Sequence, residues 1–190
     1  MKINVSAGFI LLAALVYFFD TEGMTAAFLP AVAAHEMGHA LAIRALGGRT
    51  VLVDVTSAGL RMDYAGYLTK RGELLCAAAG PLFGIALALG ASILGRFLGS
   101  EYLLCVSGVS MILSLFNLLP VSPLDGGAIL SILLSPEIRE TVLFITTLLT
   151  ASFLIALGLL MALRGFGAAS IPAGLWMLAL TRGREKPPNR

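Results

Sequence analysis

The chain has 190 residues, of which 58% are hydrophobic and 13% charged, with a formal net charge of +2 and a mean hydropathy of +0.92. This composition excludes a sizeable soluble domain, and the length leaves room for roughly six membrane helices, because each crossing takes about 20 apolar residues. We therefore expect an all-α polytopic membrane protein whose function resides in the helical bundle itself.

Six apolar stretches are expected to form the membrane helices. They fall at about residues 4–19, 24–46, 74–95, 102–120, 141–163 and 166–181. With a cytoplasmic N-terminus, only Arg96 and Arg164 of the 13 Lys and Arg residues lie outside, and Asp20 and Glu22 lie in the first outer turn. The positive-inside rule favours this orientation, which places both termini in the cytoplasm.

The second span contains the motif HEMGH at residues 35–39. On a helix, His35 and His39 lie on one face and can present two imidazole nitrogens to one metal ion. Glu36 can then reach a water at that ion without being a ligand, and ionisable groups inside a span are usually functional. The pattern predicts a zinc hydrolase with Glu36 as the general base. The alternative is a histidine pair satisfied by hydrogen bonds within the bundle.

The segment between the second and third spans has a different residue pattern from the apolar spans. Val51, Val53 and Val55 alternate with other residues in TVLVDVTSAGLRMDYAGYLT, residues 50–69, and SAG is a turn signal. Period-two alternation predicts a short membrane-associated β-hairpin between strand 51–56 and residues 60–64. We expect strand 51–56 or its hairpin partner to capture an unwound substrate segment by β-augmentation. The alternative is a cytoplasmic loop.

The third span has small residues on one face and a cysteine near its start. Gly80, Gly84 and Ala88 recur every four residues, which predicts a packing face for a neighbouring helix. Cys76 and Cys105 form no spacing motif, so both are expected to pack in the bundle.

The stretch FNLLPVSPLDGGAILSILLS, residues 116–135, interrupts the fourth span, and its Pro-rich part predicts irregular backbone at or near membrane depth. A catalytic zinc normally has three protein ligands. No third histidine exists, the cysteines have no motif, and most other carboxylates lie at span ends or in polar turns. Asp125 is thus the candidate third ligand, and the alternative is that it only caps the following helix.

HEMGH together with NLLPVSPLDGG resembles the site-2 protease family of intramembrane zinc metalloproteases, whose signatures are an HExxH helix and a distant NxxPxxxxDG-type segment. The resemblance covers about residues 24–135, the expected catalytic core of a single domain, 1–190. It implies one zinc ion per chain, held by His35, His39 and Asp125, with Glu36 as the general base. It also places Asn117 near the cleft as a substrate-binding or oxyanion residue.

The sequence also departs from that family's pattern. Members often carry an asparagine after the Gly-Pro of the next span, where GPLFG has Gly84, so no role is transferred there. The chain has no room for a PDZ or CBS domain, which resembles the compact branch of sporulation proteases acting on membrane-tethered sigma-factor precursors. The resemblance implies cleavage in or near a substrate's transmembrane segment and release of a regulatory factor to the cytoplasm.

The expected location is the cytoplasmic membrane of a bacterium, with the active site in the cytoplasmic half of the bilayer. The expected partners are lipid and a membrane-tethered substrate, without nucleic acid; a regulatory membrane protein and a second copy of the chain stay open. Two other functions compete. Buried ligands also line the ion paths of metal transporters, and a catalytically silent membrane scaffold would keep the same bundle.

Overall fold

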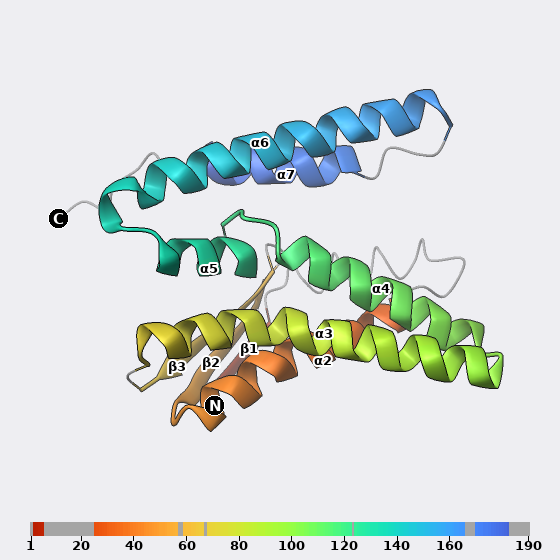
Figure 1. Cartoon of the computed structure of the whole chain (residues 1–190), viewed down its shortest axis with the longest axis horizontal. Coiled ribbons are helices and arrows are strands. Elements are labelled where there is room, and N and C mark those ends of the chain that lie inside the picture. Colours follow the sequence, from red (N-terminus) through yellow and green to blue (C-terminus); the bar gives the residue numbers. More distant parts are fainter. Residues whose placement is uncertain are drawn as a thin grey trace. The chain divides into compact units, whose positions relative to one another are not determined.

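The computed structural model describes residues 2–5, 25–56, 59–66, 68–122, 124–165 and 170–182 (Figure 1). By its contacts the chain divides into two compact units, which we call the N-terminal unit (Met1–Asn117) and the C-terminal unit (Leu118–Arg190). The assignment of residues 1–190 to one protease domain stays a prediction.

Three helices build most of the N-terminal unit: α2 (Thr25–Ala45), α3 (Lys70–Leu98) and α4 (Glu101–Asn117). Each of them contacts the other two. A buried apolar cluster contains one residue from each helix, namely Ala27, Ala91 and Val106. The motif HEMGH therefore lies on a helix that packs against both α3 and α4.

The predicted packing face of α3 is confirmed. Gly80, Gly84 and Ala88 are all buried, and α4 lies against the last two. The Ser110 hydroxyl donates to the Gly84 carbonyl at 2.9 Å, and the Ser107 hydroxyl donates to the Ala88 carbonyl at 2.7 Å. Small residues let two helix backbones approach closely, and the hydroxyl bonds then join them.

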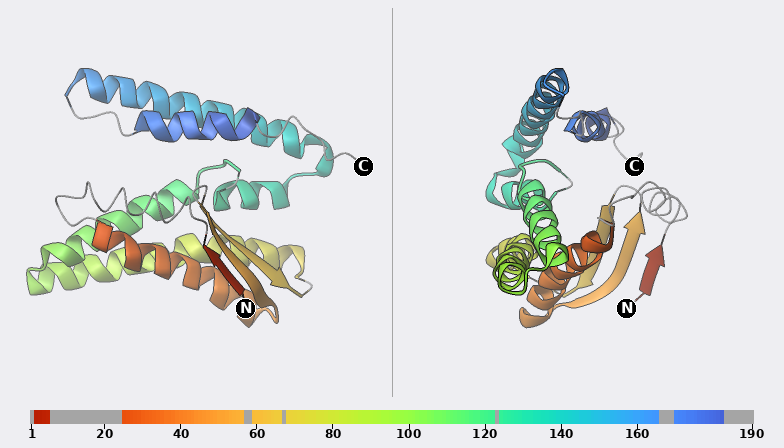
Figure 2. Two further views of the ribbon diagram at one scale, coloured as in Figure 1. Left: turned by 180° about the vertical axis from the view of Figure 1, so that it is seen from behind. Right: turned by 90° about the vertical axis from the view of Figure 1, so that its right-hand side faces the viewer.

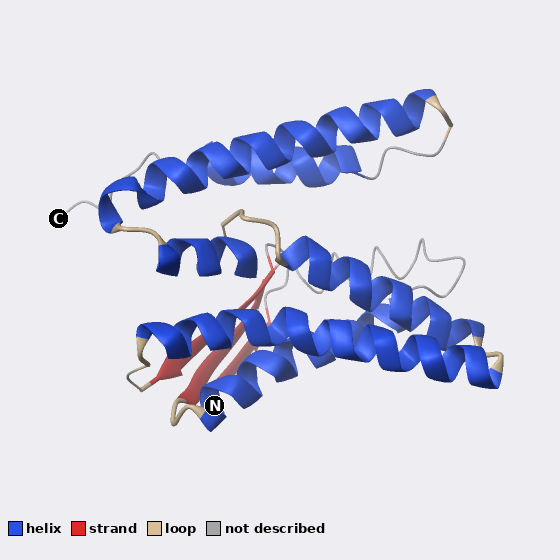
Figure 3. Cartoon of the chain, viewed as in Figure 1, coloured by secondary structure: helices blue, strands red, loops and turns tan. Residues whose placement is uncertain are grey.

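The described part of the N-terminal unit also contains a three-stranded sheet (Figure 3). Its strands are β1 (Lys2–Val5), β2 (Arg49–Thr56) and β3 (Gly59–Ala65), in the order β1-β2-β3. β2 and β3 pair antiparallel, with Arg49 opposite Ala65 and Thr56 opposite Gly59.

The strand β1 corrects the sequence analysis. Residues 4 and 5 were assigned to the first membrane span, but they lie in β1, which pairs parallel with β2 so that Asn4 faces Asp54 and Val5 faces Val55. The β-branched Ile3 and Val5 suit a strand, and the pairing partner lies about 50 residues away, beyond the reach of a hydropathy window. The rest of that predicted span, residues 6–19, lies outside the described residues.

The described residues of the C-terminal unit include the helices α5 (Asp125–Leu133), α6 (Pro136–Leu163) and α7 (Ser170–Arg182). α6 and α7 run side by side (Figure 2). At their crossing a Cβ added to Gly158 would lie 2.6 Å from the Ser170 hydroxyl, so only a glycine permits this approach.

The prediction of six membrane spans is not confirmed. Among the described residues, three helices are long and apolar enough to cross a membrane: α2, α3 and α6. Shorter apolar helices run over Glu101–Asn117 and Ser170–Ala179. At about 1.5 Å per residue, a 17-residue helix such as α4 extends about 26 Å, less than a hydrocarbon core of about 30 Å.

Candidate metal centre

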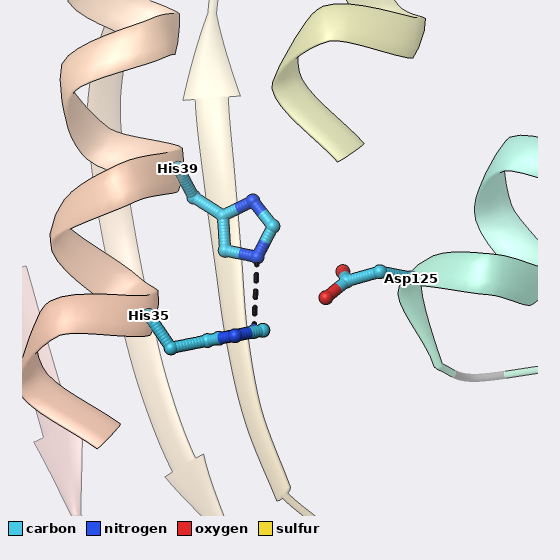
Figure 4. Close-up of side chains that lie close together, drawn as sticks. All are labelled: His35, His39 and Asp125. Atoms are coloured by element: carbon cyan, nitrogen blue, oxygen red, sulfur yellow. Dashed lines mark hydrogen bonds between the residues drawn. The ribbon is translucent and has the colours of Figure 1, made fainter. Parts of the chain in front are cut away.

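Helix α2 presents both histidines of HEMGH from one face (Figure 4). His35 and His39 are one turn apart, and the side chain of His35 is buried, with 5% of its surface exposed. Their ring centroids are 4.9 Å apart and the ring planes are nearly perpendicular, at 80°. The structure therefore brings together the two histidines that the sequence predicted as ligands.

A backbone contact fixes the orientation of the His39 ring. Nδ1 of His39 lies 2.8 Å from the carbonyl oxygen of Cys76 on α3. A carbonyl oxygen only accepts, so Nδ1 carries the hydrogen and donates it, and Nε2 is left with its lone pair. Ligating histidines usually donate their second ring N–H in this way, which orients the ring and raises its basicity.

The Nε2 atoms of the two histidines have nearly the separation that binding to one zinc ion requires. Nε2 of His39 lies 3.2 Å from Nε2 of His35. Two nitrogens bound tetrahedrally at about 2.0–2.1 Å from zinc would be roughly 3.3–3.4 Å apart. The imidazole pair thus fits the ion. Without an ion, the same distance is a hydrogen bond donated by His35, which is the alternative from the sequence.

Two glycines make this geometry possible, and the sequence analysis assigned chemistry to neither. A Cβ added to Gly38 would lie 2.5 Å from the Ala79 carbonyl oxygen, so Gly38 lets α2 and α3 approach closely. A Cβ added to Gly80 would collide with the imidazole of His39, including Nε2. The AGP sequence and the four-residue spacing predicted a packing face, but they did not show that the neighbour of Gly80 is His39.

We expect Gly80→Ala to weaken zinc binding and lower any activity of the site by about 10- to 100-fold, because a ligand displaced by about 1 Å loses that much. The added methyl would meet Cε1 of His39 at 2.6 Å and Cδ2 at 2.7 Å, so the ring must move. Zinc affinity is measured by competition with a chromophoric chelator.

Gly90→Ala is the matched control on the same helix, since nothing lies within 4 Å of its added Cβ. That variant should bind zinc normally and gain slightly in helix stability. Equal zinc affinities for the Gly80 and Gly90 variants would contradict the assigned role of Gly80.

Cys76 packs as predicted and has a further part through its backbone. Its side chain is buried against Ile43 and Leu68, and the thiol is free. The contact that concerns the site is made by its carbonyl oxygen, which accepts from His39. Sequence reasoning could not find this contact because any residue type supplies a carbonyl.

Glu36 and Asn117 both lie in the N-terminal unit. Glu36 is partly exposed on α2, next to His35. Asn117 is the last residue of α4, is partly exposed, and donates from its side-chain amide to the Leu113 carbonyl at 3.0 Å. That bond satisfies a carbonyl of the last helical turn, and the second amide hydrogen and the amide oxygen of Asn117 are still suited to bind a substrate.

Asp125 belongs to the C-terminal unit, where it is the first residue of α5. The N-cap of α5 is Leu124, with no side-chain hydrogen bond, so Asp125 lies in the first turn and not at the N-cap position that the alternative gave it. The glycines that follow are buried: a Cβ on Gly126 would strike the backbone of Leu118, and one on Gly127 that of Val121. The two glycines thus allow the backbone of the first turn of α5 to pack directly against the backbone of the preceding loop.

Comparison with known proteins agrees with the sequence motifs. The model of Peptidase family M50 matches residues 98–161, which include Asn117 and Asp125. A solved site-2 protease from Methanocaldococcus jannaschii superposes with a TM-score of 0.64 at 21% identity, covering 99% of this chain and 92% of that one. Residues 98–161 are thus similar to the peptidase family M50 model, and the chain shares the fold of that site-2 protease.

A zinc metalloprotease of the same organism is 31% identical over 113 residues, 56% of this chain and 32% of the relative. The chain thus spans about a third of the length of this curated relative. The M50 match starts after HEMGH, so the histidine half of the candidate site depends on the motif itself and on the geometry of α2.

Proposed function

We propose that this protein is an intramembrane zinc metalloendopeptidase that hydrolyses a peptide bond in or near the transmembrane segment of a membrane-tethered protein. The observation that carries the proposal is the histidine pair of α2, with Nε2 of His35 and Nε2 of His39 3.2 Å apart on a helix apolar enough to span a membrane. The M50 segment and the site-2 protease fold support the same reaction class.

The proposed zinc ligands are His35, His39 and Asp125, one ion per chain. Two imidazoles and a carboxylate are a donor set of catalytic zinc sites, and such an ion lowers the pKa of water to about 7 and polarises a peptide carbonyl. Glu36 takes the proton of the attacking water and passes it to the leaving amine nitrogen. Asn117 orients the substrate or stabilises the oxyanion with its amide.

The sheet is the proposed docking element for an unwound substrate. A transmembrane helix buries its carbonyls in internal hydrogen bonds, so the segment to be cut must become extended first. β2 is paired on both sides, by β1 and β3, so the predicted strand 51–56 is not the edge. Of the two predicted alternatives, the hypothesis of β-augmentation therefore keeps the hairpin partner, β3, which lies at an edge of the described sheet.

The proposed topology places both termini in the cytoplasm of a bacterial cell. His39 is six residues before the end of α2 at Ala45, about 9 Å along the helix. In this orientation zinc lies in the cytoplasmic half of the bilayer, and cleavage releases a regulatory factor to the cytoplasm.

A reconstituted assay tests the proposal and its rivals. Purified protein in lipid nanodiscs should cleave a membrane-tethered test substrate, lose that cleavage with a zinc chelator, and regain it when zinc is added back. Chelator-resistant cleavage would refute the zinc mechanism. Zinc flux into proteoliposomes without cleavage would favour the transporter, and neither flux nor cleavage would favour the scaffold.

A further inference from the structure

The loop before α5 has carbonyl groups that need partners. Residues 118–122 and 124 are not helical, and irregular backbone at membrane depth is tolerated only where its polar groups are satisfied. The Leu119 carbonyl accepts from the Val121 N–H at 2.7 Å, and the Val121 carbonyl accepts from the Leu124 N–H at 2.7 Å. The carbonyl of Pro120, between them, has a partner of another kind.

Thr146 of α6 supplies that partner. Its hydroxyl oxygen lies 2.7 Å from the Pro120 carbonyl oxygen and 3.2 Å from that of Leu143, one turn earlier in its own helix. A hydroxyl has one hydrogen to donate, and the shorter contact makes Pro120 the main acceptor. This hydrogen bond joins the loop to α6 across 26 residues of sequence.

The neighbouring residue, Thr147, hydrogen-bonds within α6 and not to the loop. The Thr147 hydroxyl donates to the Leu143 carbonyl at 2.6 Å, inside α6. Thr147 is also buried, with 3% of its surface exposed, whereas Thr146 is partly exposed. The two residues are thus of one type, adjacent on one helix, and differ in whether the hydroxyl reaches the loop.

Close packing transmits the position of the loop to Asp125. A Cβ added to Gly127 would lie 2.6 Å from the backbone nitrogen of Ser122, and one on Gly126 would lie 2.5 Å from the carbonyl oxygen of Leu119. The first turn of α5 therefore lies directly on the loop backbone on either side of Pro120. A shift at Pro120 must move the first turn of α5, where Asp125 begins the helix.

We propose that Thr146 is a positioning residue for Asp125: its hydrogen bond to the Pro120 carbonyl holds the loop, and the loop holds the carboxylate. The inference rests on the proposed function, in which Asp125 is a zinc ligand. Thr146 is not one of the proposed zinc ligands, so we assign it an indirect role, through its hydrogen bond to the loop.

Hydrogen exchange on zinc-free protein tests the structural step. Thr146→Val keeps the side-chain shape but removes the hydroxyl, and it should raise exchange at the amides of residues 118–127 about three- to tenfold, the effect of one such hydrogen bond. Thr147→Val should leave these amides unchanged, and Thr146→Ser should restore protection. Equal exchange in the two valine variants would overturn the proposal.

Zinc affinity, measured by chelator competition, tests the link to Asp125. Thr146→Val should weaken binding about three- to tenfold in the native background and have no effect in an Asp125→Ala background. The same loss in both backgrounds would overturn the proposal. If Asp125→Ala alone bound zinc like the wild type, the ligand assignment would fail instead, and the exchange experiment would still decide the role of Thr146.

Discussion

A Glu36→Gln variant is expected to bind zinc like the wild type and to lose proteolysis by at least about a hundredfold. Positioned general bases contribute roughly 10²- to 10⁴-fold, and an amide cannot accept the proton of the attacking water. Gln has nearly the same shape as Glu, so α2 and the orientation of His35 and His39 should not change. The cleavage rate of a membrane-tethered substrate and the zinc content after dialysis are the two measurements.

Glu101→Gln is the matched control for this prediction. Glu101 is an exposed carboxylate in the first turn of α4, so its loss changes the charge equally at a place remote in sequence from HEMGH. The control should keep both activity and zinc. Normal cleavage by Glu36→Gln would refute the mechanism, and loss of zinc from that variant would make Glu36 a ligand rather than a base.

The parts of the fold and site that depend on local sequence could be predicted. His35 and His39 are one helical turn apart, and that spacing alone sets them on one face of α2. Likewise, the Pro and Gly residues after α4 predicted the irregular stretch that ends where α5 begins at Asp125. Signals of this kind act over a few residues, so no knowledge of the tertiary structure was needed.

The parts that depend on contacts between distant segments could not be predicted. Gly80 meets His39 across 41 positions, and Thr146 meets Pro120 across 26. Spacing showed that Gly80 belongs to a packing face, but the partner on that face is set by how α2 and α3 cross. The pairing of β1 with β2 was missed for the same reason, since hydropathy extended the first span into residues 4 and 5.

Asp125→Ala is expected to lower zinc affinity by more than about 100-fold, because it removes a proposed ligand. Loss of a residue that only hydrogen-bonds a ligand typically lowers metal affinity by roughly 10- to 100-fold. Cleavage should fall at least as far, and the two histidines should still bind zinc weakly. Zinc affinity from chelator competition and the rate of substrate cleavage are measured on the same preparation. Loss of both together separates Asp125 from Glu36, whose variant should lose cleavage alone.

Glu137→Ala distinguishes a ligand from a helix-stabilising charge. Asp125 and Glu137 each lie in the first turn of a helix, α5 and α6, where a carboxylate interacts favourably with the helix N-terminus. Both variants lose that interaction, so both should be slightly less stable, and only Asp125→Ala should lose zinc. Equal zinc affinities in the two variants would reduce Asp125 to a structural charge and leave the third ligand of the histidine pair to be found elsewhere.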